Sequence, residues 1–567
     1  MRPKILTILL IAHLTACSSS SVNEVAEQAP PSPEPVAAGA AMEAYAVVDG
    51  SVTKKPLPQS KNKGIRSNAK MAMPAAVGMV NPDFRLAAEP VNRENYAAVT
   101  QNAIKNVAQE PVSTFSIDVD TGSYSNVRRI LNSGHLPPTD AVRVEELINY
   151  FDYDYPVPKS TKQPFTVSTE IAPTPWNSKT KLLHIGIKGY DVAQNKLPPA
   201  NLVFLIDVSG SMSSPDKLEL IKAAMKLLCQ QMGERDTISI VVYAGNTAVL
   251  LEPTSADNIG KIHAAIDSLG AGGSTNGGAG INLAYNMAQQ GFIKNGINRI
   301  ILATDGDFNV GTVNFQSLLD LVAEKRKSGI GLTTLGVGGG NYNDKLMEQL
   351  ADAGNGNHAY LDNLQEAQKV LVDQLSSTLH TIASDVKIQI EFNPEQVSEY
   401  RLIGYENRLL KREDFSNDKV DAGEIGAGHS VTALYEIALK GEGGERLENL
   451  RYSTKQDNSS HKGHELAFLR LRYKPTSDAK SRLLETPLLK SQISHRLERT
   501  SENFRFAAAV AGFGQLLRGG QYTENFGYDA VKQLAQDARG EDKFGYRAGF
   551  LSLIDLAKSV SAVKPAP

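Results

Sequence analysis

One segment constrains this chain more than any other, an apolar run that ends in a carboxylate and two hydroxyls. The run Leu202–Ile206 contains no polar residue, which predicts a central strand buried on both faces. Asp207-Val208-Ser209-Gly210-Ser211 follows, and Ser214-Pro215 then begins a predicted helix. Open α/β folds place their ligand sites at the carboxyl ends of parallel strands, where these oxygens lie. Hard oxygen ligands suit Mg²⁺ or Mn²⁺, so the sequence predicts a metal-dependent binding site.

Residues 199–382 alternate predicted strands and helices, which indicates an α/β fold with a doubly wound, mostly parallel, Rossmann-like sheet. The predicted strands are Leu202–Ile206, Ile238–Tyr243, Thr247–Leu251, Arg299–Ala303, Leu332–Val337 and His358–Leu361. Two more segments end at the same sheet edge, a glycine-rich turn that offers the Thr275 hydroxyl and Ala303-Thr304-Asp305, which offers a carboxylate. Three loops are therefore expected to bring five side chains together: Asp207, Ser209, Ser211, Thr275 and Asp305.

This set resembles the metal-ion-dependent adhesion site of von Willebrand factor type A (VWA) domains, in which Asp-x-Ser-x-Ser is joined by a distant threonine and aspartate. All five positions match in order. The resemblance implies that Ser209, Ser211 and Thr275 bind the cation directly, and that Asp207 and Asp305 bind it directly or through water. With few carboxylates bound directly, the ion keeps uncompensated positive charge. It is then expected to accept an acidic side chain of a protein partner as its remaining ligand.

The regions outside this block are expected to form three further units. Residues 92–198 are predicted to form an N-terminal α+β module, residues 383–478 a β-rich, sandwich-like domain, and residues 479–567 a helical region that begins at Ser481. Alternating polarity over 165–198 is typical of half-buried antiparallel strands. The sequence is compatible both with pairing of these strands to those of 383–478 and with separate β units.

Three segments in these flanking regions carry a narrower resemblance. Thr114–Tyr124, Arg143–Phe151 and Phe504–Gly514 resemble the bacterial YfbK-like family of VWA lipoproteins. Together with the central block, the resemblance covers about residues 95 to 560. It implies the architecture above and little about chemistry.

The N-terminus predicts export and lipid attachment. Arg2 and Lys4 precede the short apolar run Ile5–Ala12, and Leu14-Thr15-Ala16-Cys17 follows. This pattern resembles a bacterial lipoprotein signal, which implies a signal peptide at 1–17, a lipid on Cys17 and, because Ser18 follows, the outer membrane of a Gram-negative cell envelope. Residues 18–91 are rich in Ala, Pro and Ser and predict a disordered tether. Cys229 is the only other cysteine, so we expect a buried core thiol and no internal disulfide.

Composition narrows the functional classes. The formal net charge of −3 gives no overall basic field for nucleic acid, and no pattern indicates a small-molecule substrate. No nucleophile is combined with a base, and we expect no histidine or lysine with a role near Ser209 and Ser211, so the sequence predicts no enzyme. Two alternatives stay open: a cell-envelope scaffold in which the metal is structural, and a metal-dependent hydrolase that would need a general base at the site.

Two other motifs have simpler interpretations. Asp120-Thr121-Gly122-Ser123 matches the tetrapeptide of aspartic proteases, but the chain has no second such motif to supply a facing carboxylate. We expect Asp118, Asp120 and Ser123 to cap the following helix or to bind a structural cation. Gly336–Gly340 lacks the lysine of a phosphate-binding loop and is predicted to be a flexible loop near the metal face.

Overall fold

The computed structural model describes residues 93–160, 162–274, 277–306, 314–448, 462–476 and 479–563. The predicted signal peptide at 1–17, the lipidated Cys17 and the tether at 18–91 lie outside the described residues, as does Thr275. Residues 85–567 form one compact unit. In the described part of that unit, no helix combines the length and apolar character needed to cross a membrane.

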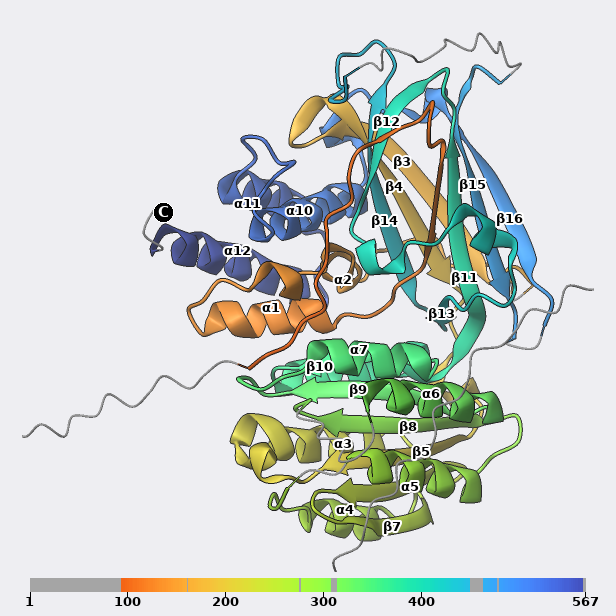
Figure 1. Cartoon of the computed structure of the whole chain (residues 1–567), viewed down its shortest axis with the longest axis vertical. Coiled ribbons are helices and arrows are strands. Elements are labelled where there is room, and N and C mark those ends of the chain that lie inside the picture. Colours follow the sequence, from red (N-terminus) through yellow and green to blue (C-terminus); the bar gives the residue numbers. More distant parts are fainter. Residues whose placement is uncertain are drawn as a thin grey trace, which may run out of the picture. The chain divides into compact units, whose positions relative to one another are not determined.

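The central block is a six-stranded sheet in the order β10-β9-β8-β5-β6-β7 (Figure 1). All neighbours are parallel except β6 and β7, which are antiparallel. The strands are β5 (Ala200–Asp207), β6 (Thr237–Tyr243), β7 (Thr247–Ser255), β8 (Ile297–Thr304), β9 (Gly331–Val337) and β10 (His358–Leu361). The predicted α/β class and mostly parallel sheet are therefore confirmed.

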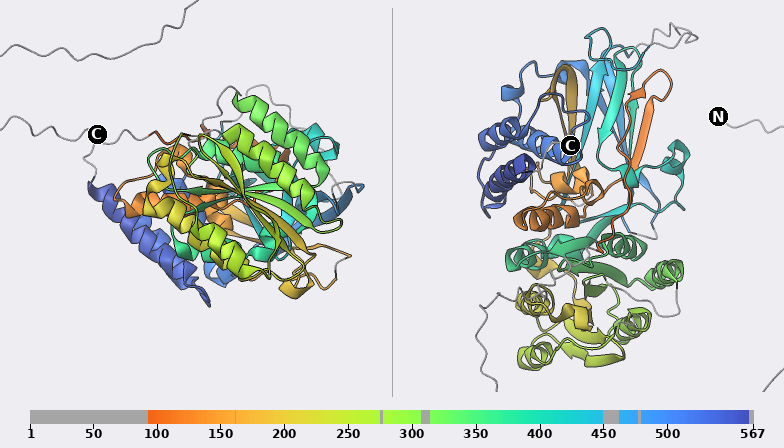
Figure 2. Two further views of the ribbon diagram at one scale, coloured as in Figure 1. Left: turned by 90° about the horizontal axis from the view of Figure 1, so that it is seen from below. Right: turned by 60° about the vertical axis from the view of Figure 1, so that its left-hand side comes forward.

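Helices cover both faces of this sheet, as Figure 2 shows. They are α3 (Leu220–Cys229), α4 (Ile259–Asp267), α5 (Gly277–Gln290), α6 (Phe315–Lys325), α7 (Asp344–Ala353), α8 (Leu364–Gln368) and α9 (Leu375–Leu379). Strand β5 shows why the fold forms: Phe204 packs into the core under α3 and α4, whereas Leu205 packs into the core under α5 and α6. Cys229 is buried in the first of these cores with its thiol free, as expected.

Two antiparallel sheets pack face to face beyond this block (Figure 1). One has the order β1-β12-β14-β4-β3, and the other has the order β13-β11-β15-β16 with β2 paired to β11. Strand β4, which precedes the α/β block, pairs directly with β14, which follows it. The strands are β1 (Lys105–Asn106), β2 (Val112–Ser116), β3 (Phe165–Thr174), β4 (Asn177–Gly189), β11 (Thr381–Phe392), β12 (Val397–Ile403), β13 (Gly423–Gly426), β14 (Ser430–Leu439), β15 (Glu465–Lys474) and β16 (Arg482–Leu489).

A helical layer combines the two ends of the described chain. It consists of α1 (Gly122–Asn132), α2 (Val144–Asn149), α10 (Glu502–Leu517), α11 (Tyr528–Asp537) and α12 (Tyr546–Val563). Aromatic contacts join the early and late helices, with ring centroids 4.9 Å apart for Phe151 and Phe506 and 6.5 Å apart for Tyr124 and Phe550. The C-terminal helices therefore complete a core that the N-terminal module begins.

The predicted start of the helical region at Ser481 is wrong. Residues Arg482–Leu489 form strand β16, which pairs antiparallel with β15, and the first long helix begins only at Glu502. Strand β16 is an exposed edge strand that contains Pro487, a residue tolerated in a sheet chiefly at its edge. It therefore lacks the apolar alternation that marks a half-buried strand.

Candidate metal site

The predicted ligands gather where two neighbouring parallel strands end. Asp207 is the last residue of β5, and Asp305 directly follows Thr304, the last residue of β8. Ser209 and Ser211 lie in the turn after β5, with their hydroxyl oxygens 3.0 Å apart. Four of the five predicted residues are thus at one edge of the sheet.

Thr275, the fifth, lies outside the described residues, but the loop that leads to it is placed. The amide of Gly272 donates to the carbonyl of Val208 at 2.7 Å, and the amide of Gly210 donates to the carbonyl of Gly273 at 3.0 Å. Two backbone hydrogen bonds therefore fix the glycine-rich turn against the Ser209–Ser211 loop. Glycine suits this turn because Gly273 has a φ of +87°, in the left-handed region.

Asp207 is fully buried and is oriented by hydrogen bonds to both oxygens. Oδ1 accepts from the Ser209 amide at 2.9 Å, and Oδ2 accepts from the Thr304 hydroxyl at 2.7 Å. Burial raises the pKa of Asp207, while the hydrogen bonds from Ser209 and Thr304 act in the opposite direction. A bound cation would favour the ionised form of this carboxyl.

Lys217 also reaches this edge, which corrects the expectation that no lysine has a role near the two serines. Its Nζ lies 2.9 Å from Oδ2 of Asp305 and 3.1 Å from Oδ1 of Asn341, and the residue is only 7% exposed. Burial acts to raise the pKa of Asp305, but the hydrogen bond and charge of Lys217 bring it below its usual value. The lysine therefore holds Asp305 ionised.

The glycine-rich loop after β9 lies beside Asp305 and Lys217, next to the candidate metal site, as the sequence predicts. The Lys217 side chain passes directly over Gly338, where a Cβ atom would come within 2.1 Å of it. Gly338 also has a φ of +69°, so a side chain here would be both strained and in collision. Asn341 of the same loop donates to Oδ2 of Asp305 at 3.1 Å. Sequence analysis missed Lys217, Thr304 and Asn341.

The expected helix cap at Asp118, Asp120 and Ser123 is also wrong. Asp120 accepts from the backbone amide of His358, and Asp118 lies 3.2 Å from Nε of Arg408. The Ser123 hydroxyl donates to the carbonyl of Ala141. His358 and Arg408 are distant in sequence from helix α1, so local spacing could not indicate these two contacts.

The donor set at the sheet edge fits a hard divalent cation. No group of three or more His, Cys, Asp and Glu side chains that could hold a metal occurs in the described part of the chain. A cation at Asp207 and Asp305 would therefore depend on the adjacent hydroxyls for its remaining protein ligands. Oxygen-only coordination of this kind suits Mg²⁺ and Mn²⁺ rather than zinc.

The fold and this edge define a protein of the VWA class, and comparison with known proteins agrees. A family model described as von Willebrand factor type A domain matches residues 201–374, a model named von Willebrand factor matches 90–184, and a model of the YfbK C-terminal region matches 377–560. The protein YfbK of Escherichia coli (strain K12) is 50% identical over 477 residues, which cover 82% of each chain. The chain therefore belongs to the YfbK family of VWA proteins.

More distant similarities involve parts of the chain. Human inter-alpha-trypsin inhibitor heavy chain H3 is 27% identical over 284 residues, covering 45% of this chain and 31% of that protein. A solved von Willebrand factor type A structure from Catenulispora acidiphila shares 15% identity, covers 70% of this chain and 91% of that chain, and has a TM-score of 0.38. VWA domains generally mediate protein interactions, and they commonly hold a divalent cation.

Proposed function

We propose that this protein captures an acidic group of a partner protein through Mg²⁺ or Mn²⁺ held by Asp207, Ser209, Ser211, Thr275 and Asp305, without catalysis. One observation carries the proposal: two carboxylates and two hydroxyls, from the end of β5 and from the segments that follow β5 and β8, lie at the carboxyl edge of the sheet. Loops at this edge are where open α/β folds bind their ligands.

The charges at the site favour an anionic partner. Asp207 and Asp305 carry two negative charges, and Lys217, at 2.9 Å from Asp305, carries one positive charge. A divalent cation added to these groups leaves a net positive charge at the edge of the sheet. A carboxylate from a partner would neutralise that charge and fill an open position on the ion.

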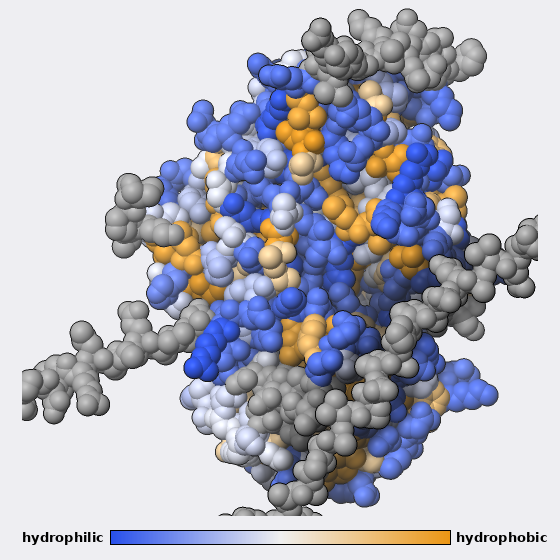
Figure 3. All heavy atoms as spheres, viewed as in Figure 1, coloured by the Kyte–Doolittle hydropathy of each residue, from blue (hydrophilic) through white to orange (hydrophobic). Residues whose placement is uncertain are grey.

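The described residues that are visible on one face of the molecule also favour recognition by charge. On the face shown in Figure 3, the apolar side chains gather in small, separate patches rather than in one broad area. Large single apolar patches are typical of surfaces that dock partners by hydrophobic burial. A partner held by one strong ionic contact needs no such patch.

The position of Lys217 argues against the hydrolase alternative. A metal-dependent hydrolase needs a base that is free to accept a proton from water. Lys217 instead donates hydrogen bonds to both Asp305 and Asn341, and its positive charge stabilises the ionised carboxylate of Asp305. We therefore favour binding, in keeping with the usual role of VWA domains.

The direct test compares partner capture from a cell-envelope extract by the wild type and by Asp207→Ala, each with and without EDTA. Asp257→Ala is the matched control because Asp257 is an exposed aspartate of the same domain. We expect proteins recovered by the wild type in Mg²⁺ to disappear with EDTA and with Asp207→Ala, but to remain with Asp257→Ala. The same proteins in every sample would contradict metal bridging and favour a scaffold.

We further propose that Cys17 is lipidated and anchors the chain in the outer membrane of a Gram-negative envelope. The support is the sequence Leu14-Thr15-Ala16-Cys17 after a short apolar run. Labelling with a fatty-acid analogue should mark the wild type but not Cys17→Ser, and fractionation should find only the wild type with outer membranes. Equal labelling of both proteins would contradict the anchor.

A further inference from the structure

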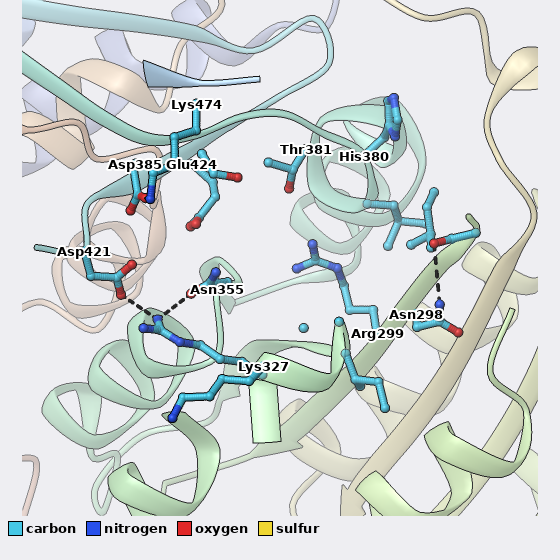
Figure 4. Close-up of a pocket in the computed structure, with 18 of the residues that line it drawn as sticks. Asn298, Arg299, Lys327, Asn355, His380, Thr381, Asp385, Asp421, Glu424 and Lys474 are labelled. Atoms are coloured by element: carbon cyan, nitrogen blue, oxygen red, sulfur yellow. Dashed lines mark hydrogen bonds and ion pairs between the residues drawn. The ribbon is translucent and has the colours of Figure 1, made fainter. Parts of the chain in front are cut away.

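A second polar site lies at the end of the α/β sheet opposite the edge that carries Asp207 and Asp305, which we call the metal edge. A cavity of about 540 Å³ is lined by the start of β8, the turn between α6 and β9, and residues of β11 and β13 (Figure 4). Arg299, at the start of β8, is six residues before Asp305, which corresponds to roughly 20 Å along an extended strand. The cavity is therefore separate from the proposed metal site and lies between the α/β block and the antiparallel sheets.

Arg299 is an arginine without a counter-ion. The residue is 6% exposed, and its guanidinium points into the cavity (Figure 4). Nη1 donates to the Thr333 hydroxyl at 2.8 Å, whereas Nε has no hydrogen-bond partner among the described residues. None of the described carboxylates forms an ion pair with it. Burial lowers the pKa of Arg299 to about 10.

Glu424, on β13, is its counterpart across the cavity. Its carboxyl group also points into the open space, and Oε1 is buried with no hydrogen-bond partner in the described part of the chain (Figure 4). Burial, followed by the charges of Asp421 and Asp385, raises the pKa of Glu424 to about 8; Arg326 and Arg299 act against that rise. Arg299 and Glu424 attract each other but do not form an ion pair.

Four other charged groups that line the cavity form two ion pairs, and Lys419, which also lines it, is exposed to solvent. Arg326 contacts Asp421 at 2.5 Å, and Lys474 contacts Asp385 at 2.5 Å. Burying a charge without a partner costs far more than burying a paired one. Arg299 and Glu424 each have a buried polar atom without a partner among the described residues, and a ligand that carries both a negative and a positive charge would satisfy the two.

We propose that this cavity binds a small zwitterion that carries a carboxylate and an amine, of the amino acid class. The carboxylate would pair with the Arg299 guanidinium, whose planar fork suits two parallel hydrogen bonds. The ammonium would pair with the Glu424 carboxylate. A volume of about 540 Å³ lies within the range typical of small-molecule sites.

The test measures binding of each of the twenty amino acids to the whole protein by calorimetry and by thermal shift. For any amino acid that binds, its N-acetyl derivative removes the ammonium and its amide derivative removes the carboxylate. We expect each derivative to bind about tenfold more weakly or worse, because each loses one charged hydrogen-bonding group. If no amino acid binds at millimolar concentration, or if acetate binds as well as the zwitterion, the proposal is wrong.

Variants then test which residue binds the carboxylate of the ligand and which binds its amine. Arg299→Met should abolish the preference for a free carboxylate, and Glu424→Gln should abolish the preference for a free amine. Lys327→Gln is the control, because Lys327 lines the rim with an exposed side chain and pairs with Glu324. Unchanged affinity in both cavity variants would overturn the assignment.

Two further measurements separate ligand binding from a structural role. Without ligand, Arg299→Met should keep or raise the melting temperature, because it removes a buried cation that has no counter-ion; a large decrease together with unchanged binding would identify a structural arginine. Pairing with an ammonium should also lower the pKa of Glu424, so calorimetry near pH 7 in two buffers should detect proton release. Release that persists in Glu424→Gln would contradict the amine assignment.

Discussion

Two of the regions in which the molecule buries acidic side chains differ in the cations that accompany the carboxylates. Around Arg143, the guanidinium contacts Asp344 at 2.5 Å and Glu146, and it lies 3.7 Å from Glu348. At the metal edge, Asp207 has only hydroxyl and amide donors, and Asp305 has the single ammonium of Lys217. The carboxylates of both regions are buried, but only those of the first region are paired with arginine.

This difference distinguishes the cluster around Arg143, which joins two parts of the fold, from the proposed metal site. The Arg143 cluster joins α2 of the helical layer to α7 of the α/β domain, because Asp344 and Glu348 both lie on α7. Arg408 extends it, with contacts to Asp118 and, at 2.7 Å, to Asp352. Arginine satisfies several carboxylates at once, whereas hydroxyls leave room for a metal. A buried carboxylate therefore indicates a ligand site only when its partners leave its charge unmatched.

The largest effect is predicted for a substitution that removes Arg143, the central cation of the Arg143 cluster. Arg143→Met should lower the free energy of unfolding by about 3–5 kcal/mol, because it removes the cation that Asp344 and Glu146 share in the buried interior. Thermal and denaturant unfolding measure this change. Arg235→Met is the control, since Arg235 is exposed. A loss as small as that of the control would show that the cluster does not hold the two layers together.

A smaller effect, on Mg²⁺ affinity and partner capture, is expected for a substitution at the metal edge; this prediction rests on the proposed function. Lys217→Met removes the positive charge next to Asp305, so the affinity for Mg²⁺ should rise by about tenfold while capture of an acidic partner falls by about as much. Calorimetry with MgCl₂ and partner capture measure the two changes. Lys226→Met, on helix α3 and paired with Asp267, should change neither. Parallel changes in both affinities would contradict the charge argument.

The sheet could be predicted because each central strand is buried on both faces. The run Leu202–Ile206 has apolar residues at every position, and the structure places β5 at Ala200–Asp207. Strand β12 (Val397–Ile403), whose residues include Ser398, Glu399 and Arg401, was missed because polar groups interrupt its pattern. Arg401 pairs with Glu436 of the neighbouring strand, which becomes evident only once the sheet has formed.

The candidate metal site could be predicted where its residues are close to one another in the sequence. Asp207, Ser209 and Ser211 lie within five residues, so their spacing alone places them together. Lys217 could not be assigned because lysine is usually solvent-exposed, and its burial depends on the loop at Gly338. The Arg143–Asp344 contact spans 201 residues, and no local pattern encodes such a pair.

The smallest predicted effect is the pH dependence of stability that Glu348 contributes to the Arg143 cluster. Burial raises the pKa of Glu348 to about 7, against the opposing charges of Arg143 and Arg408. In the unfolded chain this carboxyl titrates near its ordinary value of 4.5. Between about pH 4.5 and 7 the folded state therefore keeps a proton that the unfolded state has lost, and the contribution of Glu348 to stability falls as the pH rises through this range.

Glu348→Gln removes this titration while keeping a group that accepts from Asn407, the hydrogen-bond partner of Glu348. The difference in the free energy of unfolding between the variant and the wild type should be more favourable to the variant at pH 8 than at pH 5, by on the order of 1 kcal/mol. At pH 8 only the wild type carries an extra buried charge. Unfolding midpoints at the two pH values measure the difference. Glu324→Gln, with a side chain 71% exposed, should show no such dependence. If the stability difference between Glu348→Gln and the wild type is the same at both pH values, Arg143 and Arg408 already compensate the charge of Glu348. Every carboxylate of the Arg143 cluster would then be paired with an arginine.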